Sequence, residues 1–244
     1  MTRLLNVGEI GIAREELPPF DRGPIDVRAW FGPAVANQPL DLEIGSGKGT
    51  FLVQEALRTP AVNHIGIEWA RAYWRHAADR CRRRGLRNVR LVQVEAAMFV
   101  RCYVADAVFR QVHVYFPDPW PKTRHHKRRL IQEPFLRQLH RILEPAGLVR
   151  LATDHDLYFS WMQGHAARTH HLFEMLPFAP LESAGDDELV GTNFERKYRR
   201  QGRPFYAMLL RKRSRGTIKA TEATWNISGP IARPVDEILD RSSL

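Results

Sequence analysis

The sequence predicts an α/β protein in which a mostly parallel, doubly wound sheet carries helices on both faces. Short apolar runs alternate along the chain with segments whose apolar residues recur at helical spacing, a rhythm typical of strand–helix–strand units. The first run leads into a glycine-rich turn, Gly45 to Gly49, that opens a helix. Three acids, Glu43, Glu68 and Glu95, stand at the ends of three successive runs. Because parallel strands end at one edge of a sheet, we expect these acids to gather there.

The first half of the chain supplies three strands and three helices. Residues 39–44 alternate weakly in hydrophobicity and predict a strand, and residues 50–57 have helical spacing up to a Thr-Pro stop. Apolar runs at 62–69 and 89–94 predict two further buried strands, each followed by a helical segment. The two helices are expected over 70–84, which a glycine stops, and over 96–104.

The second half continues the same rhythm. A strand at 111–116 runs into a proline-rich loop, and the helix expected over 130–143 requires Pro134 to lie in its first turn. Asp154 follows a strand and is expected to cap the next helix. The remaining elements are a strand over 148–152, a helix over 155–167, a short strand over 171–176 and a last strand over 205–210.

Composition divides the chain into three parts. Residues 1–36, interrupted by Pro-Pro and Gly-Pro pairs, are expected to be irregular and to pack on the domain formed by residues 37–212. In residues 213–244 Ser, Thr, Gly and Pro become more frequent, which indicates a tail of unknown role. Two cysteines, Cys81 and Cys102, fit neither a metal motif nor a disulfide framework. With no apolar run of membrane-spanning length and no signal pattern, the sequence predicts a cytoplasmic protein without a membrane partner.

The charge balance favours a polyanionic partner. Lys and Arg number 37 and Asp and Glu 27, which gives a net charge of +10 and an isoelectric point near 10.1. Nucleic acid is the commonest partner of such a protein, although a basic protein without one stays an alternative. Four cations, Arg124, Lys127, Arg128 and Arg129, follow the proline-rich loop and are expected to bind an RNA backbone.

The glycine turn with its acids indicates the kind of small ligand. The glycine spacing fits neither the phosphate loop nor the dinucleotide fingerprint. Glu43 would repel a diphosphate but would suit a ligand that carries an ammonium and a sulfonium. Glu68 is placed to accept from ribose hydroxyls, and Glu95 to meet an adenine edge. Each acid alone is more often a surface or capping group, but together they describe S-adenosylmethionine better than NAD or ATP.

The proline-rich loop, Phe116-Pro117-Asp118-Pro119-Trp120-Pro121-Lys122, predicts the reactive part of the site. Prolines stiffen it, because they fix φ and remove hydrogen-bond donors. It combines one carboxylate, one flat ring and nearby positive charge, which suits a nucleobase on a polyanion. A solvated connector is the alternative interpretation of this loop taken alone.

Five segments carry a resemblance to a known family: this loop, Asp41 to Gly49, Gly66-Ile67-Glu68, Thr153-Asp154 and Thr192 to Glu195. In these segments the chain resembles the bacterial tRNA (guanine-N7)-methyltransferases. The resemblance implies a Rossmann-like class I methyltransferase fold with an antiparallel last strand, S-adenosylmethionine as methyl donor, no metal, and a guanosine in the tRNA variable loop as target. Where the family more often has Asp, this chain has Glu95. The resemblance implies these roles: donor binding by Glu43, Gly45, Gly47, Glu68, Glu95 and Asp118, catalysis by Asp118, and guanosine binding by Lys122, Asp154, Thr192, Asn193, Phe194 and Glu195.

The chemistry expected of this site is mainly positioning. Guanine N7 carries a lone pair and no proton, so it needs no general base, and a carboxylate such as Asp118 can orient the ring. Three alternatives remain open from the sequence. An exocyclic-amine methyltransferase would have a second proline where Trp120 stands. The others are a catalytically silent RNA-binding module and a nicotinamide oxidoreductase. Either a monomer or a homodimer fits.

Overall fold

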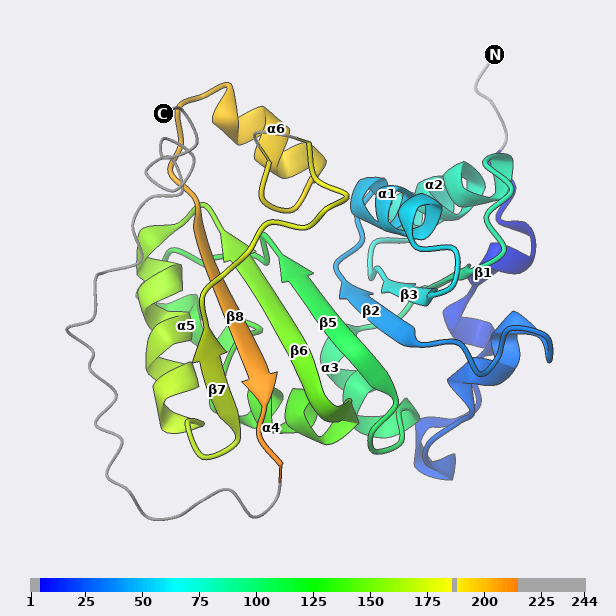
Figure 1. Ribbon diagram of the computed structural model, residues 1–244, viewed down its shortest axis with the longest axis horizontal. Helices are drawn as coiled ribbons and strands as arrows, with labels where there is room; N and C mark the ends of the chain where they lie inside the picture. Colours follow the sequence, from blue (N-terminus) through cyan, green and yellow to red (C-terminus); the bar gives the residue numbers. More distant parts are fainter. Residues whose placement is uncertain (1–4, 186–187, 215–244) are drawn as a thin grey trace.

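The computed structural model describes residues 5–185 and 188–214. Within these residues eight strands form one sheet in the order β1-β4-β3-β2-β5-β6-β8-β7. Neighbouring strands are parallel from β1 to β6, whereas β8 runs antiparallel to both β6 and β7 (Figure 1). The predicted fold class, including the antiparallel last strand, is confirmed. The strands are β1 Gly11–Ile12, β2 Leu40–Ile44, β3 Asn63–Ile67, β4 Val89–Val92, β5 Phe109–Tyr115, β6 Leu143–Thr153, β7 Phe173–Leu176 and β8 Tyr206–Lys212.

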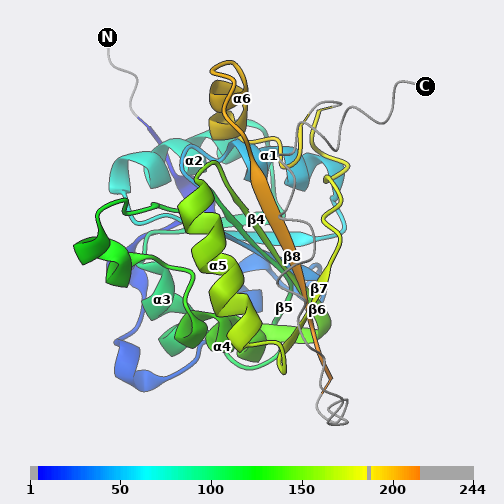
Figure 2. The ribbon, with the colours of Figure 1, turned by 90° about the vertical axis from the view of Figure 1, so that its left-hand side faces the viewer.

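Helices cover both faces of this sheet. The buried side chains of α1 and α2 pack with those of β4 in one apolar cluster, and a larger cluster on the other face joins α4 and α5 to the central strands. Figure 2 shows α4 and α5 on the same side of the sheet, close to α3. β2 and β3 are buried along their whole length, as expected of strands covered on both faces. The helices are α1 Thr50–Arg58, α2 Arg71–Arg83, α3 Ala96–Met98, α4 Glu133–Ile142, α5 Asp156–Arg168 and α6 Asn193–Arg199.

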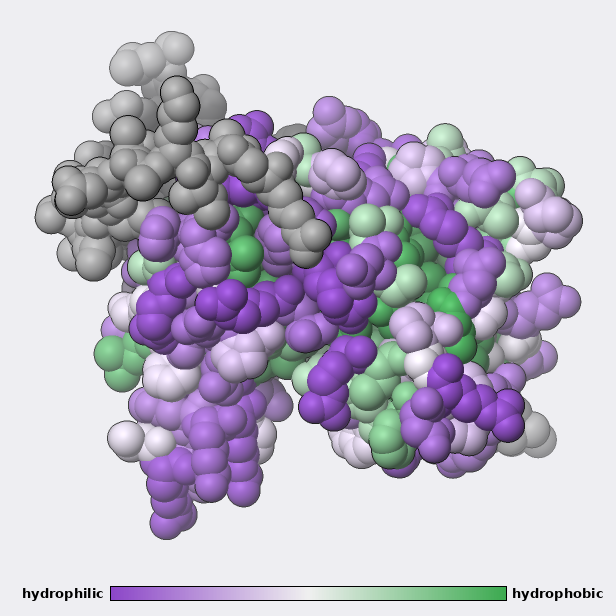
Figure 3. Space-filling view, turned by 90° about the horizontal axis from the view of Figure 1, so that it is seen from below, coloured by the Kyte–Doolittle hydropathy of each residue, from purple (hydrophilic) through white to green (hydrophobic). Residues whose placement is uncertain are grey.

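The molecule has one face at the amino ends of the parallel strands and an opposite one at their carboxyl ends. Hydrophilic residues cover most of the face at the amino ends, and apolar residues lie between them in smaller groups (Figure 3). The ligand-binding edge of an open parallel sheet is the other one, at the carboxyl ends of the strands.

The structure agrees with one local prediction and differs from two others. Pro134 does lie in the first turn of its helix, which begins at Glu133. The strand expected over 148–152 is longer than predicted, because β6 already pairs at Leu143 with Phe109 and then shifts register. Asp154 does not cap α5; His155 does, since its Nδ1 accepts from the Tyr158 N–H at 3.3 Å. The carboxylate of Asp154 is engaged elsewhere, with Arg203.

The segment before β2 is less irregular than predicted. It consists of short 3-10 turns, but Gly11–Ile12 forms β1 and pairs in parallel with β4 at the edge of the sheet. Val27 and Phe31 are buried in the large apolar cluster, so the segment packs on the sheet and its helices. The domain boundaries at 36 and 212 stay predictions, and residues 215–244 of the predicted tail lie outside the described residues.

Candidate active site

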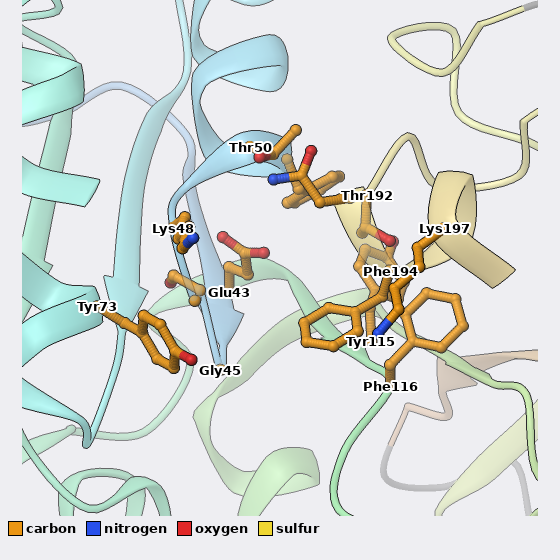
Figure 4. Close-up of a pocket in the computed structure, with 14 residues that line it drawn as sticks. Glu43, Gly45, Lys48, Thr50, Tyr73, Tyr115, Phe116, Thr192, Phe194 and Lys197 are labelled. Carbon is orange, nitrogen blue, oxygen red and sulfur yellow. The ribbon is translucent and has the colours of Figure 1, made fainter. Parts of the chain in front are cut away.

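The carboxyl ends of four neighbouring strands enclose two adjoining cavities. The larger, of about 580 Å³, is lined from the ends of β2, β3, β4 and β5, and we call it the donor cavity. The smaller, of about 240 Å³, lies between the glycine turn and α6, and we call it the inner cavity (Figure 4). Together they fall in the size range of small-molecule sites. Both are lined by Gly45, Gly47, Tyr73, Tyr115, Phe116 and Phe194.

The glycine turn leaves space for a ligand at its surface. Gly45 and Gly47 have φ values of +82° and +52°, a backbone conformation that L side chains rarely adopt. A Cβ atom added to either residue would meet no atom within 4 Å, so the backbone there faces open space. The turn is held in place by the Gly45 and Ser46 N–H groups, which both donate to the Ile67 carbonyl at 2.9 Å. A rigid, open backbone of this kind lets a ligand approach closely.

Glu43 is a buried carboxyl group at the wall of the inner cavity. Its side chain comes from β2 beside the turn, and only 5% of the residue is exposed. Burial, reinforced by the neighbouring Glu68 and Glu55 carboxylates, raises the pKa of Glu43 to about 8. Among the described residues its Oε2 has no hydrogen-bond partner. Because an unpaired buried polar atom costs free energy, this position suits a ligand that brings a cationic donor.

Glu68 and Glu95 hold the backbone around the donor cavity as well as lining it. The two carboxylate oxygens of Glu68 accept from the N–H groups of Gly47 and Ala70, each at 2.8 Å. Glu95 caps α3, with its oxygens accepting from Ala97 N–H at 2.9 Å and Met98 N–H at 2.7 Å. Both acids keep further lone pairs for a ligand. Glu95 therefore has the helix-capping role that the sequence left open as an alternative. Its contact with adenine stays a prediction.

The proline-rich loop places Asp118 on the donor cavity. Asp118 is exposed and lines the cavity together with Phe116 and Trp120, both of which have positive φ. Such backbone conformations persist only where surrounding contacts enforce them. Phe116 stacks with Phe194 of α6 at 6.3 Å between ring centroids, which joins the loop to the inner cavity.

Arg129 is buried and holds this loop through a hydrogen bond to its backbone. It is 2% exposed, and its Nε donates to the Pro119 carbonyl at 2.8 Å. Its guanidinium packs 5.0 Å from the Tyr158 ring and 5.1 Å from the Trp161 ring. The side chain is buried against these groups, so its position does not favour the predicted contact with RNA, which stays a prediction. Arg124, Lys127 and Arg128 are exposed, as an RNA contact requires.

We expect Arg129→Gln to lower kcat without changing the salt dependence of RNA binding. The shorter amide loses the packing between the two rings and the bond to Pro119, so the loop that carries Asp118 loosens. A drop in kcat of about tenfold, with an unchanged slope of log Kd against log salt, is the expected pattern. Steady-state kinetics and filter binding at several salt concentrations measure the two quantities. A reduced slope with normal kcat would show that Arg129 contacts phosphate after all.

Three residues of the segment 192–195 line the inner cavity, but Glu195 does not. Thr192 Oγ1 accepts from the Glu195 N–H at 3.0 Å and so caps α6. Glu195 is fully buried, and its carboxylate accepts from three backbone N–H groups of residues 189–191 and pairs with Arg199 at 2.9 Å. With these partners it positions the segment and has no oxygen directed at a substrate. Thr192, Asn193 and Phe194 remain as lining residues.

Two other predicted guanosine contacts lie away from the cavities. Lys122 is exposed and lines neither of them. Asp154 also lines neither, and its carboxylate pairs with Arg203 at 2.8 Å. The cavities are lined instead by residues for which the sequence predicted no role: Lys48, Tyr73 and Lys197 line the inner cavity, and Trp69, 54% exposed, lines the donor cavity. For Lys48, Trp69 and Tyr73, the only sequence signal of a place at the site was that they follow closely after a strand.

Across 5–185 and 188–214 there is no group of three or more His, Cys, Asp or Glu side chains that would hold a metal ion. No helix in the described part of the chain is long and apolar enough to cross a membrane.

The doubly wound sheet, the open glycine turn and the acids at successive strand ends define a class I methyltransferase. A family described as putative methyltransferases matches residues 37–208. The antibiotic-resistance methyltransferase Kmr has a similar fold, with a TM-score of 0.51 and 16% identity over 77% of this chain and 93% of its own.

The particular family follows from closer relatives. The tRNA (guanine-N(7)-)-methyltransferase of Rhodopirellula baltica is 38% identical over 82% of this chain and 73% of its own length. The enzyme of the same name from Treponema pallidum is 36% identical over 80% and 74%. This chain belongs to the tRNA (guanine-N(7)-)-methyltransferase family.

The residues present fit the methyl donor of this family. S-adenosylmethionine carries an ammonium group that matches the unpartnered oxygen of buried Glu43. The open backbone at Gly45 and Gly47 leaves room for its methionine portion. The apolar wall of the donor cavity, which includes Ile67, Val94 and Leu130, suits an adenine ring.

Proposed function

We propose that this protein transfers the methyl group of S-adenosylmethionine to N7 of a guanosine in the variable loop of tRNA. One observation carries the proposal beyond family membership. Of the two adjoining cavities, the inner cavity is lined by the buried carboxyl group of Glu43 and the donor cavity by the exposed carboxylate of Asp118. The first suits the ammonium of the donor, and the second suits the N–H groups of guanine.

The donor is held by residues at or just after the ends of β2, β3 and β4. S-adenosylmethionine supplies, when bound, an electrophilic methyl group on a sulfonium centre. Glu43 pairs with its ammonium and gains the partner that its Oε2 lacks. Glu68 accepts from the ribose hydroxyls through lone pairs not used by Gly47 and Ala70, and Glu95 meets the adenine edge. The backbone at Gly45 and Gly47 lies against the methionine portion.

The acceptor is oriented by the proline-rich loop. Guanine N7 has a free lone pair, so no residue has to remove a proton from it. Asp118 accepts from guanine N1–H and the exocyclic amine, which points N7 along the line of displacement. Since the methylated ring is cationic, the same carboxylate stabilises the charge that develops on it. Phe194, 51% exposed and stacked on Phe116, offers a surface for the base.

The other predicted contacts follow from this placement. Thr192 and Asn193 reach the acceptor from the inner cavity, and Lys122 contacts a phosphate next to the target guanosine. Asp154 acts through Arg203, which it fixes by an ion pair. Glu195 acts as a positioning residue, because it holds residues 189–191 and the start of α6 together.

We propose that the protein acts as a monomer or as a homodimer. A cytoplasmic location is part of the proposal, because tRNA is the substrate and neither Cys81 nor Cys102 forms a disulfide.

Methyl transfer from labelled S-adenosylmethionine to bulk tRNA that lacks 7-methylguanosine tests this function. We expect the label in 7-methylguanosine when the nucleosides are separated, and at a variable-loop position when the tRNA is fragmented first. Fully modified tRNA is the control and should accept no label. Label in another nucleoside, or none while the donor still binds, would contradict the proposed reaction.

A further inference from the structure

A third hollow adjoins the donor cavity on the side of α3. It has a volume of about 410 Å³, and Glu95, Arg128 and Leu130 line both it and the donor cavity. We call this hollow the flanking groove. Because it opens from the cavity beside Asp118, a strand of RNA whose guanosine enters the site has a neighbouring nucleotide within reach of it.

The flanking groove is lined by basic and by apolar residues. Its exposed charged side chains are those of Arg101, Lys127 and Arg128, opposed by the single acid Glu95. Within the described residues none of the three cations forms an ion pair; Arg128 lies 5.0 Å over the Trp120 ring. Cations that no carboxylate neutralises attract a phosphate. Apolar surface between them, from Met98, Leu130, Pro134 and Phe135, suits a sugar or a base.

Arg101 is placed in the groove by an unusual piece of backbone. It lies in the π-helical turn Phe99–Tyr103, a conformation that is rare and frequently found at functional sites. The guanidinium of Arg141 donates to the Val100 carbonyl at 2.6 Å and to the Val104 carbonyl at 2.7 Å. Asp106 holds the same guanidinium at 2.9 Å. These bonds hold the backbone of the π-helical turn in place, and Arg101 is part of that turn.

We infer that the flanking groove binds the phosphodiester of a nucleotide next to the target guanosine, with Arg101 as a phosphate contact that faces Lys127 and Arg128. This inference rests on the proposed function and adds a specific RNA-binding site to it. Arg129, expected from the sequence to bind RNA, lines the same groove but is buried, and Arg101 adds an exposed cation from a distant part of the chain.

Arg101→Gln is the test, with Arg87→Gln as matched control. Arg87 is also exposed, but it precedes β4 and therefore lies at the opposite edge of the sheet. We expect Arg101→Gln to raise the Kd for tRNA about fivefold to tenfold near 0.15 M salt and to reduce the slope of log Kd against log salt by about 1. The Kd for S-adenosylmethionine and kcat at saturating tRNA should stay within about twofold of wild type. Arg101→Lys should restore the slope.

The outcomes separate this inference from the proposed function. Wild-type Kd and slope in Arg101→Gln overturn the flanking-groove site, as does an equal effect of Arg87→Gln, which would reflect net charge alone. A wild-type protein that binds tRNA but makes no 7-methylguanosine overturns the proposed reaction, whereas the binding measurement on Arg101 variants still decides the groove.

Discussion

Replacing Asp118 with Ala is expected to lower kcat for tRNA methylation by about two to three orders of magnitude. The Kd for S-adenosylmethionine should change less than about threefold, because Glu43, Glu68 and the glycine turn hold the donor without Asp118. The physical reason is the loss of the carboxylate that orients guanine and faces the charge forming on it. Single-turnover methylation at saturating tRNA and calorimetric binding of the donor give the two quantities separately.

Asp118→Asn is the matched variant for this result. The amide keeps the shape of the side chain and one carbonyl acceptor, but it loses the charge and one acceptor atom. An intermediate kcat, between those of wild type and Asp118→Ala, would indicate that orientation and charge both contribute. Normal turnover in the alanine variant would remove Asp118 from the mechanism.

The second large effect is expected at Glu43, where donor binding and folding stability should change in opposite directions. Glu43→Gln should raise the Kd for S-adenosylmethionine about 10- to 100-fold, because a charge-assisted hydrogen bond to the ammonium is replaced by a neutral one. The same change should stabilise the ligand-free protein, since the amide removes a buried ionisable group with no partner for its Oε2. Calorimetry measures the first effect and thermal unfolding the second.

The pH dependence at Glu43 follows from its raised pKa. The ordinary value is 4.5 and burial raises it to about 8, so the folded protein favours the neutral carboxyl. The stability that this form contributes is complete below pH 4.5 and is lost as pH rises through 8. At pH 7 the ionisable group therefore costs on the order of 3 kcal/mol relative to glutamine. The melting temperature of Glu43→Gln should exceed that of wild type increasingly from pH 5 to 8.

Donor affinity should show the opposite trend with pH. The ion pair with the ammonium requires ionised Glu43, so the Kd of wild type should fall by up to about tenfold per pH unit from pH 6 towards 8. Binding should release a proton, which calorimetry in two buffers of different ionisation enthalpy detects. Glu144→Gln, at an acid that pairs with Arg28 away from the cleft, is the control and should keep the wild-type profile. A pH-independent wild-type Kd would mean that Glu43 does not bind the ammonium.

The sequence by itself determined those features that depend on neighbouring residues. The alternation of apolar runs with helical spacing is local, and it was enough for the central strands and for α1, α2, α4 and α5. The glycine turn and the proline-rich loop were also readable, because Gly and Pro restrict or free the backbone wherever they stand. Strand ends of a parallel sheet share one edge, so the order of the elements predicted that Glu43, Glu68 and Glu95 gather there. Glu68 and Glu95 line the donor cavity and Glu43 lines the adjoining inner cavity.

Only the tertiary structure decided which of the charged residues near the site face solvent. Arg129 is buried because the Pro119 carbonyl and the Trp161 ring contact it, and Trp161 comes from a segment whose approach no local pattern encodes. Glu195 is buried by nearer partners, Arg199 and the backbone of residues 189–191, in a folded-back loop that the hydrophobic pattern does not encode. Arg101 lines the flanking groove for a reason of the same kind, since Arg141, forty residues later, holds its turn in place. Burial and pairing are properties of the packed chain, and they separate the residues that build this site from those left free to bind its ligands.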